Sequence, residues 1–437
     1  MNDWQTVTLE DVTESINTGL DAIRRAPIVE HKTNLRCLRI QDISQNKPFD
    51  KWGYTEVKDS DFKKFQLVPN DIIMARTRST GICYLVKKEL PAVFNNGLAR
   101  IRLKIEKVDP KFIYYVFKSK HFSGYIDGIS GGTSVQLNMK IGDLLKYQFN
   151  LPPLSEQKEI ARILSDLDKK IELNTQINQT LEQIAQPLFK SWFVDFDPVR
   201  AKVQALSDGM SLEQAELAAM QAISGKTPEE LTALSQTQPD RYAELAETAK
   251  AFPCEMVEVD GVEVPKEWEV KRIDEVIQKI PVGKKYSSKT AFSEGLVPIL
   301  DQGRSGVIGY HNDKPGVKAS IEDPIIVFAN HTCYMRLISY DFSAIQNVFA
   351  FKGKECNLYW LYLATLGKQE FVEYKGHFPD FLIKEIIVPP EELTELFGKY
   401  VKESFSKIFI NDRENSNLAK IRDLLLPKLL NGGIQNE

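Results

Sequence analysis

A chain of 437 residues with a net charge of −4 and 43% hydrophobic residues has the composition of a globular protein of two to four domains. It contains no apolar run of about 18 residues and begins without a basic-then-apolar leader, which argues against membrane insertion and secretion. The five cysteines are odd in number and widely spread, as is typical of reduced thiols, so we expect a cytoplasmic protein with no membrane partner.

The charge is unevenly distributed along the chain. Residues 1–150 carry 23 lysines and arginines against 17 acidic residues, whereas residues 191–260 carry 5 against 13. A basic excess in the first block is compatible with a polyanionic partner.

Short β-rich runs followed by an aromatic helix predict a mixed α+β domain, mostly sheet, over residues 1–150. We expect strands at Leu35–Ile40, Asp71–Met74 and Ala99–Ile105, and a helix at Pro110–Lys118.

A single long helix is predicted over residues 151–193. Its apolar stripe follows the 4-3-4-3 spacing of a heptad seam, so the helix needs a partner helix to cover it. The seam comprises Ile160, Leu164, Leu167, Ile171, Asn174, Asn178, Leu181, Ala185 and Leu188. Asn174 and Asn178 are polar residues within this seam, which usually fix register at some cost in stability. Pro187 is expected to kink or end the helix.

Residues 194–260 form an acidic segment that separates two similar halves of the chain. Short helices are predicted at Ser211–Ala222, Pro228–Gln236 and Asp240–Ala251. The segment is interpreted either as a docking surface for another protein or as a solvated helical insertion.

The second half repeats the first, with a mixed domain over residues 261–387 and a long helix over residues 388–437. Strands are expected at Pro298–Leu300, Pro324–Phe328 and Ala344–Phe351, and a helix at Leu358–Thr365. The second seam runs through Phe397, Val401, Ser404, Ile408, Asn411, Asn415, Leu418, Arg422 and Leu425. At Arg422 the apolar stripe is expected to shift to Ile421, which corresponds to Ile184 in the first copy.

The offset between equivalent positions falls steadily along the chain, which indicates a duplication. Trp4 matches Trp268 at 264, Phe112 matches Leu358 at 246, and the proline pairs that precede the long helices match at 237. The two seams can cover each other only if the helices run antiparallel. A pseudo-twofold axis should then bring Asn174 near Asn415 and Asn178 near Asn411. The expected fold is α+β, with two sheet-rich domains separated by two long antiparallel coiled-coil helices.

The sequence contains no motif that requires catalysis. Gly225-Lys226-Thr227 lacks the earlier glycine of a phosphate loop, and Asp168-Lys169-Lys170 lies on the predicted coiled coil. His331 and Cys333 form a lone pair without further metal ligands. We therefore expect no catalytic residue and no metal site in this chain.

Polar loops next to strands are the candidate DNA contacts, because arginine and amide side chains can bind base edges bidentately. The candidates in the first domain are Arg76, Arg78, Ser79, Thr80, Asn95, Ser134, Gln136 and Asn138. Those in the second domain are Gln302, Arg304, Ser305, Asn330, His331, Lys375 and His377. Each loop taken alone is more typical of ordinary surface, and the occurrence of two such sets in two repeated domains favours DNA contact.

Several segments resemble the specificity subunit of type I restriction–modification systems. They are LPPLSEQKEIARIL (151–164), LEQIAQPLFKSWFVDFDPVRAK (181–202), VEVPKEWEVKRIDEV (262–276) and IRDLLLPKLLNGGI (421–434). The second proline segment departs from the LPPLSEQ pattern, and the acidic insertion is long.

This resemblance implies two target-recognition domains at residues 1–150 and 261–387, each reading one half of a bipartite, asymmetric site in double-stranded DNA. The helices at 151–193 and 388–437 would set the gap between the halves and bind two methyltransferase subunits, and restriction subunits would join the complex. No cofactor is expected in this chain; S-adenosylmethionine, ATP and Mg would be held by partner subunits. The alternatives are a stand-alone DNA-binding or coiled-coil scaffold protein, or a nuclease or methyltransferase with an unrecognised site.

Overall fold

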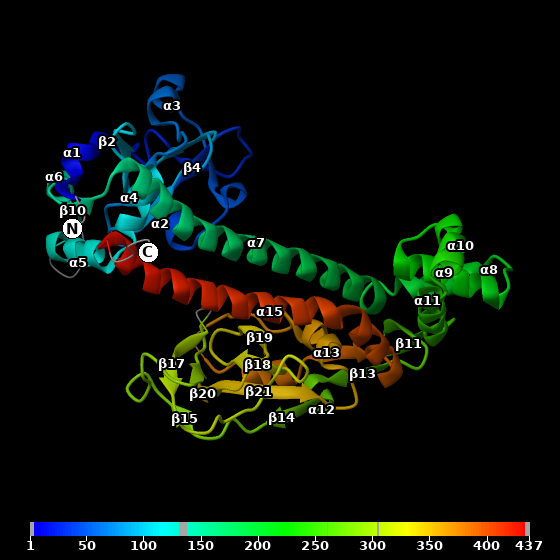
Figure 1. Ribbon diagram of the computed structural model, residues 1–437. Coiled ribbons are helices and arrows are strands. Elements are labelled where there is room, and N and C mark those ends of the chain that lie inside the picture. The colour runs from blue at the N-terminus through cyan, green and yellow to red at the C-terminus, as the bar shows by residue number, and fades with distance from the viewer. Residues whose placement is uncertain (1–3, 131–137, 260, 304–305, 374, 433–437) are drawn as a thin grey trace. The chain divides into compact units, whose positions relative to one another are not determined.

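The computed structural model describes residues 4–130, 138–259, 261–303, 306–373 and 375–432 (Figure 1). They form two compact units, Met1–Leu173 with Glu414–Glu437 (unit 1) and Asn174–Arg413 (unit 2). The long helices α7 (Leu154–Phe193) and α15 (Glu391–Leu430) each contribute to both units. Within the described ranges, no helix combines the length and hydropathy that a membrane span needs.

Unit 1 is a sheet-rich domain that packs on the first part of α7 and the last part of α15. Its strands are β1 (Gln5–Thr8), β2 (Thr13–Thr18), β3 (Ile28–Val29), β4 (Arg36–Leu38), β5 (Gly53–Thr55), β6 (Ile72–Ala75), β7 (Cys83–Leu85), β8 (Ala92–Phe94), β9 (Leu98–Leu103) and β10 (Gln148–Leu151). Its shorter helices are α1 (Leu9–Val12), α2 (Ile40–Ser44), α3 (Asp59–Phe65), α4 (Pro110–Phe117), α5 (Lys120–Ile129) and α6 (Ile141–Leu145), with a 3-10 turn at Phe49–Lys51.

Unit 2 contains the acidic helices, the second sheet-rich domain and the remaining parts of α7 and α15. Its strands are β11 (Met256–Val259), β12 (Val262–Pro265), β13 (Glu269–Arg272), β14 (Ile277–Ile280), β15 (Lys285–Tyr286), β16 (Val297–Leu300), β17 (Val307–His311), β18 (Ile325–Ala329), β19 (Met335–Ile338), β20 (Ser343–Ile345), β21 (Val348–Gly353) and β22 (Glu385–Val388). Its shorter helices are α8 (Asp197–Ser207), α9 (Leu212–Ser224), α10 (Pro228–Thr237), α11 (Pro239–Ala251), α12 (Ile273–Val276), α13 (Leu358–Thr365) and α14 (Phe378–Leu382).

The duplication predicted from the sequence is present in the sheets. The strand order β2-β9-β6-β7 in unit 1 is repeated as β14-β21-β18-β19 in unit 2, and the ribbon β1-β10 is repeated as β13-β22. The second sheets share a three-strand arrangement, β5-β4-β8 in unit 1 and β17-β16-β20 in unit 2, each with one antiparallel and one parallel pair. The fourth strand differs, because β3 pairs with β5 whereas β15 pairs with β20. The two domains therefore share one sheet, the ribbon and three strands of the other sheet, and they diverge in its fourth strand.

The central strand of each shared sheet is buried on both faces, because alternate side chains of a strand point to opposite sides. In β6, Ile72 and Met74 join the core beneath α4 and α7, while Ile73 and Ala75 join the core toward the second sheet. In β18 the same alternation separates residues 326 and 328 from residues 325 and 327.

The short helix that follows the sheet is docked on the long helix in the same way in both units. In unit 1 the Asp109 N–H donates to Gln157 Oε1 (2.8 Å) of α7, and in unit 2 the Asn357 N–H donates to Thr394 Oγ1 (3.0 Å) of α15. Asp109 and Asn357 are also the N-caps of α4 and α13. This pairing has an offset of 248, so the sequence match of Phe112 with Leu358 was out of register by two residues.

The helix seam is buried or half-buried at each predicted position, and the helices are antiparallel within each unit. In unit 2, Asn411 Nδ2 donates to Asn178 Oδ1 (2.8 Å), which confirms the predicted contact. Asn178 Nδ2 in turn donates to Asp412 Oδ1 (2.8 Å). The predicted proximity of Asn174 to Asn415 joins two units and stays a prediction, as does the twofold axis.

In unit 1 the polar end of the seam is an ion pair. Arg422 Nη1 donates to Asp168 Oδ1 (2.6 Å), and Tyr115 of α4 donates its hydroxyl to Asp168 Oδ2 (2.8 Å). The expected shift of the stripe to Ile421 was wrong: Ile421 is half-exposed, while Arg422 remains on the seam because Asp168 neutralises it.

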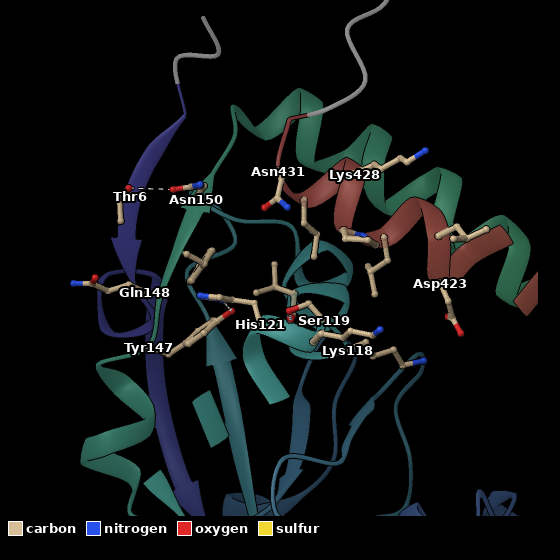
Figure 2. Close-up of a pocket in the computed structure, with 17 residues that line it drawn as sticks. Thr6, Lys118, Ser119, His121, Tyr147, Gln148, Asn150, Asp423, Lys428 and Asn431 are labelled. Carbon is tan, nitrogen blue, oxygen red and sulfur yellow. Dashed lines mark hydrogen bonds between the residues drawn. The ribbon is translucent and has the colours of Figure 1, made fainter. Parts of the chain in front are cut away.

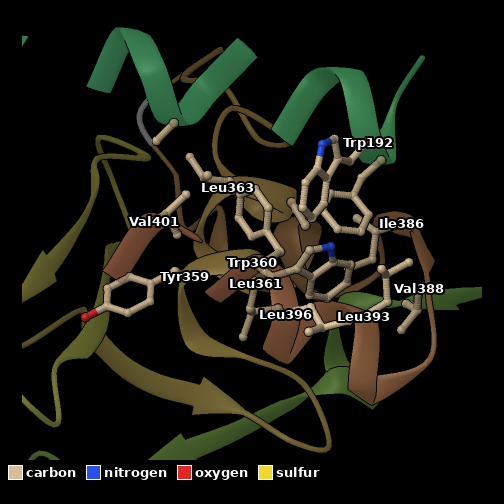
Figure 3. Packing of buried hydrophobic residues seen from close by; sticks show 14 of the residues in the cluster. Trp192, Tyr359, Trp360, Leu361, Leu363, Ile386, Val388, Leu393, Leu396 and Val401 are labelled. Atoms are coloured by element: carbon tan, nitrogen blue, oxygen red, sulfur yellow. The ribbon is translucent and has the colours of Figure 1, made fainter. Parts of the chain in front are cut away.

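Pro187 does not end α7, which continues for six residues to Phe193. Trp192 (Figure 3) and Phe193 are 0% and 4% exposed, and both rings contact the Phe397 ring of unit 2. This burial offsets the hydrogen bond that proline removes.

Other predicted elements needed correction. The run Ala344–Phe351 is two strands, because Asn347 adopts φ +67 in a turn between β20 and β21. The run Leu35–Ile40 ends early, since Ile40 begins α2. The three helices predicted in the acidic segment are present as α9, α10 and α11, but α8 and the β11–β12 hairpin were not predicted.

Candidate nucleic-acid interface

The two sheet-rich domains hold their polar loops in the same backbone arrangement. In unit 1, Arg76 follows β6; its N–H donates to the Gly97 carbonyl (2.9 Å) and its carbonyl accepts from the Met139 N–H (2.8 Å). In unit 2, Asn330 follows β18, and it makes the same two bonds, to the Asn347 carbonyl (2.9 Å) and from the His377 N–H (2.9 Å).

We call this arrangement the loop frame. It joins the residue after the central strand, the turn between β8 and β9 or between β20 and β21, and the residues that precede α6 or α14. Because each connection is between backbone atoms, the frame constrains chain position while leaving the side chains free to differ. It brings together candidates that lie far apart in the sequence.

In unit 1, Arg76 is half-buried and helps to hold the loop frame together. Its Nη1 donates to Thr18 Oγ1 (3.1 Å), while its buried Nε has no hydrogen-bond partner among the described residues. Asn95 lies in the β8–β9 turn, and its buried Oδ1 likewise lacks a partner within the described part of the chain. Thr80 Oγ1 accepts from Ser130 Oγ (3.2 Å), which ties the loop after β6 to the end of α5.

Arg78 and Asn138 are the exposed candidates of this loop frame. Arg78 adopts φ +63, a left-handed conformation that turns the loop after β6. Asn138 forms an isolated antiparallel bridge with Thr77, which holds its segment beside Arg78. Ser79 is half-buried, and its N–H donates to the Thr77 carbonyl (2.8 Å). Candidates Ser134 and Gln136 lie outside the described residues.

In unit 2, His331 connects the three segments of the loop frame. Its Nδ1 lies 2.8 Å from the Lys375 carbonyl and its Nε2 lies 3.1 Å from Asn347 Nδ2, while its N–H donates to Gln302 Oε1 (2.9 Å). A carbonyl can only accept and an amide nitrogen can only donate, so Nδ1 donates to the carbonyl and Nε2 accepts from the amide. His331 thus positions the loops.

The other candidates of unit 2 differ in exposure. Asn330 is 7% exposed, and its Oδ1 accepts from the Phe378 N–H (2.8 Å). His377 is fully buried, with Nε2 3.0 Å from the Glu373 carbonyl, so neither residue presents a base-reading edge in this arrangement. Lys375 is exposed; hydrogen bonds and charge from Glu373 and Asp380 raise the pKa of its ammonium, which therefore stays charged at neutral pH. Arg304 and Ser305 lie outside the described residues.

Two positions of the unit 2 frame were missed from the sequence. Asn347 holds His331, and Gln369 Nε2 lies 3.4 Å from His377 Nδ1. Gln302, Thr332, Gln369 and Phe371 line an open hollow of about 420 Å³ beside these loops. Asn347 could have been found, because Gln346-Asn347 repeats the pair Asn95-Asn96; Gln369 has no signal in the sequence.

The chemistry of the exposed side chains suits hydrogen bonding to nucleic acid. A guanidinium, an ammonium and an amide can bind phosphates and the major-groove edges of guanine and adenine. Among the residues that the structure describes, no group of three or more His, Cys, Asp or Glu side chains could hold a metal ion.

The chain is similar to several known proteins. Residues 1–183 match the family model of the type I restriction modification DNA specificity domain. The chain is 40% identical over 469 aligned residues to the type I restriction enzyme HindI specificity subunit of Haemophilus influenzae, covering 99% of this chain and 100% of that protein. It is 26% identical to the MjaIX specificity subunit of Methanocaldococcus jannaschii, over 85% of this chain and 79% of that protein. The crystal structure of a type I restriction–modification S subunit from M. genitalium shares the fold, with a TM-score of 0.53 and 17% identity over 98% of this chain and 96% of that one.

Proposed function

Since the chain belongs to the family of type I restriction enzyme specificity subunits, we propose that its two loop frames read a bipartite, asymmetric DNA sequence. Each sheet-rich domain reads one half-site. The observation that carries the proposal is the repetition of the same two backbone hydrogen bonds at Arg76 and at Asn330, with different side chains around them. A repeated frame with divergent side chains is what two readers of different half-sites require.

Within each loop frame, the exposed residues are proposed to contact DNA and the buried ones to position them. Arg78, Asn138 and Lys375 are exposed and carry donors, so they are the proposed contacts. Arg76, Asn330 and the two histidines hold the frame through hydrogen bonds. Ser79, Thr80, Asn95 and Gln302 are part of the same loops.

The long helices are proposed to bind two methyltransferase subunits. Leu173 and Ile184 are about half-exposed on α7, and Ile410 and Ile421, each 237 residues later, are about half-exposed on α15. In each helix the two residues are 11 positions apart in the sequence, a spacing of about three helical turns. Equivalent apolar positions on both helices suit two copies of the same partner.

Catalysis is proposed to reside on partner subunits. We propose that methyltransferase subunits hold S-adenosylmethionine, that restriction subunits hold ATP and Mg, and that this chain supplies specificity without chemistry of its own. Adenine methylation by the purified chain alone would overturn this division and favour an enzyme with an unrecognised site.

The test is to express the chain with its methyltransferase in cells that lack adenine methylation and to map methylated sites by sequencing the methylome. A bipartite motif with a fixed gap is expected. Arg78→Asn tolerates the left-handed backbone and removes the guanidinium, so it should relax one half-site about tenfold or more and leave the other unchanged. Arg24→Asn, an exposed arginine outside the loop frame, is the matched control. An unchanged motif in Arg78→Asn would exclude this residue as a reader, and a continuous motif would contradict the two-reader proposal.

A further inference from the structure

Unit 1 contains a pocket that the DNA-reading proposal does not use. Its volume is about 790 Å³, and it lies between the β1–β10 ribbon, the start of α5 and the last turns of α15 (Figure 2). Leu426, Leu430 and Phe149 give it apolar walls. A cavity of this size, mostly apolar with a few polar groups, is within the range of binding pockets.

The far wall of the pocket is rigid and partly polar. His121 Nδ1 lies 2.8 Å from the Tyr147 hydroxyl, and Tyr147 is fully buried, which raises the pKa of its phenol to about 12. Thr6 donates to Asn150 Oδ1 (3.0 Å) across the ribbon at another side. The pocket is therefore formed by well-packed elements.

In unit 2 the equivalent residues lie in a hydrophobic core. Antiparallel pairing aligns β10 with β22 and α15 with α7 at an offset of 237, so Phe149, Leu426 and Leu430 correspond to Ile386, Phe189 and Phe193. In unit 2 these three positions belong to one hydrophobic core together with residues of the acidic insertion. The insertion residues in that core are Phe196, Val199, Ala219, Met220 and Ile223, among others.

One insertion segment of that core has a distinct chemistry. Phe196 lies between Asp195 and Asp197 and precedes the amphipathic helix α8, and its ring meets the Trp268 ring at 5.6 Å. Trp268 is 3% exposed, whereas its counterpart Trp4 in unit 1 is only half-buried. Unit 2 therefore covers this tryptophan with an aromatic residue between two carboxylates, whereas the equivalent tryptophan of unit 1 is less buried.

The charges that line the pocket complement such a segment. Lys118, Lys120 and Lys428 line it, against one acidic residue, Asp423. Lys118 lies 3.8 Å from Asp168 and Asp423 pairs with Arg422, so the exposed Lys120 and Lys428 are the charges that a partner would meet. An aromatic side chain would enter the apolar part while flanking carboxylates meet the lysines.

We propose that this pocket is the docking site for a segment of a partner protein with an aromatic residue flanked by carboxylates, followed by a short amphipathic helix. A second copy of this chain does not supply the segment, because Phe196 is 5% exposed and already packed in its own core. The proposal concerns a protein contact and is independent of DNA reading.

The probe for the test is a fluorescent peptide with the sequence of residues 194–207, titrated into the full chain by fluorescence anisotropy. Micromolar binding is expected. Replacing Phe196 by Ala in the peptide should weaken it about tenfold or more, because the aromatic anchor supplies most of the buried apolar area. No saturable binding up to millimolar peptide would overturn the proposal.

Variants of the full chain test the location. Lys120→Glu with Lys428→Glu should weaken the peptide about tenfold, since each attraction becomes a repulsion. Lys111→Glu with Lys158→Glu changes the net charge equally at exposed positions outside the pocket and should have no effect. Leu424→Trp, at a lining residue that is 67% exposed, should block the pocket without disturbing the fold. Equal weakening by both charge pairs, or competition by a DNA oligonucleotide, would show non-specific binding and refute the assignment.

Discussion

Replacing Asp168 with alanine should loosen unit 1 where α4, α7 and α15 meet. The carboxylate accepts hydrogen bonds from Arg422 (2.6 Å) and from the Tyr115 hydroxyl (2.8 Å), and Lys118 lies 3.8 Å away. The exposed fractions of the Asp168 and Arg422 side chains are 27% and 22%, so solvent screens this contact only in part. One side chain therefore connects three helices.

The loss of stability expected for Asp168→Ala follows from the two hydrogen bonds of the carboxylate. A hydrogen bond to a charged group contributes about 1.5–3 kcal/mol, but Arg422 keeps a second partner, Asp423, when the carboxylate is removed. We therefore expect a loss of about 2 kcal/mol in local stability. Asp166→Ala is the matched control, two residues away on the same helix. Its ion pairs with Arg162 and Lys169 are about half-exposed, so its removal should change local stability far less than the removal of Asp168.

Native-state hydrogen exchange is the suitable assay, because a chain with two units has no single unfolding free energy. A local loss of about 2 kcal/mol should speed exchange of α4 and of the last turns of α15 about 30-fold in Asp168→Ala. Amides in unit 2 should be unchanged. Equal effects of the two substitutions, or unaltered exchange in α4, would refute the assigned role.

The stability that the Asp168 contact contributes depends on pH. Burial on its own would raise the pKa of the Asp168 carboxyl, but the Arg422 hydrogen bond, the Lys118 charge and the Tyr115 hydroxyl together hold the pKa below its ordinary value. A carboxyl whose pKa is lowered in the folded state contributes stability that is present above the pKa of the unfolded chain. This stability is lost as pH falls through the pKa of the folded state. The contact is therefore complete at neutral pH and weakens only in acid.

Three further substitutions test the long helices, each by thermal unfolding and hydrogen exchange of unit 2. Asn178→Leu alone should destabilise unit 2 by about 1–3 kcal/mol, because Asn411 and Asp412 lose their amide partner. Asn178→Leu combined with Asn411→Leu should restore or exceed the original stability. Equal losses in the single and the double variant would contradict a polar pair in an apolar seam. Partial desolvation and the neighbouring Glu182 raise the pKa of Asp412 to about 6, so the stability that this carboxyl contributes is full below its ordinary pKa and is lost as pH rises through 6. Asp412→Asn should therefore stabilise unit 2 by about 1 kcal/mol at pH 7.5, after allowance for solvent screening, and should not stabilise it at pH 4. A gain in stability that does not depend on pH would exclude titration of Asp412 as the cause. Pro187→Ala should stabilise the end of α7 by about 2 kcal/mol, because one helical hydrogen bond is restored. An unchanged stability would mean that the aromatic packing already offsets the missing hydrogen bond.

The duplication and the long helices could be predicted from sequence because they depend on spacing. The heptad seam fixed the buried face of both helices, and the asparagine register predicted the Asn178–Asn411 contact. Prediction failed where a tertiary partner changes the preference of a residue. Arg422 stays on an apolar seam because Asp168 meets it, and α7 passes through Pro187 because aromatic rings bury its end.

The candidate site was predictable only as a set of loops. Polar residues after β6 and β18 marked its location, but exposure separates positioning residues from contacts, and exposure is decided by packing. His377 looks like a surface histidine in the sequence, yet its ring is fully buried beneath the loop that contains Lys375. Periodicity carries no information on such loops, since their backbone follows neither the helical nor the strand repeat.

The duplicated halves differ in what surrounds them, because the helices α8–α11 occur once. At the place of Asp168, unit 2 has Phe405, whose ring stacks on Tyr359 at 4.9 Å, so an ionic contact in one half is replaced by an aromatic one in the other. Two copies of one binding protein would consequently meet unequal receptors. Their occupancy should rise in two separate steps during a titration, with a singly loaded species accumulating in between.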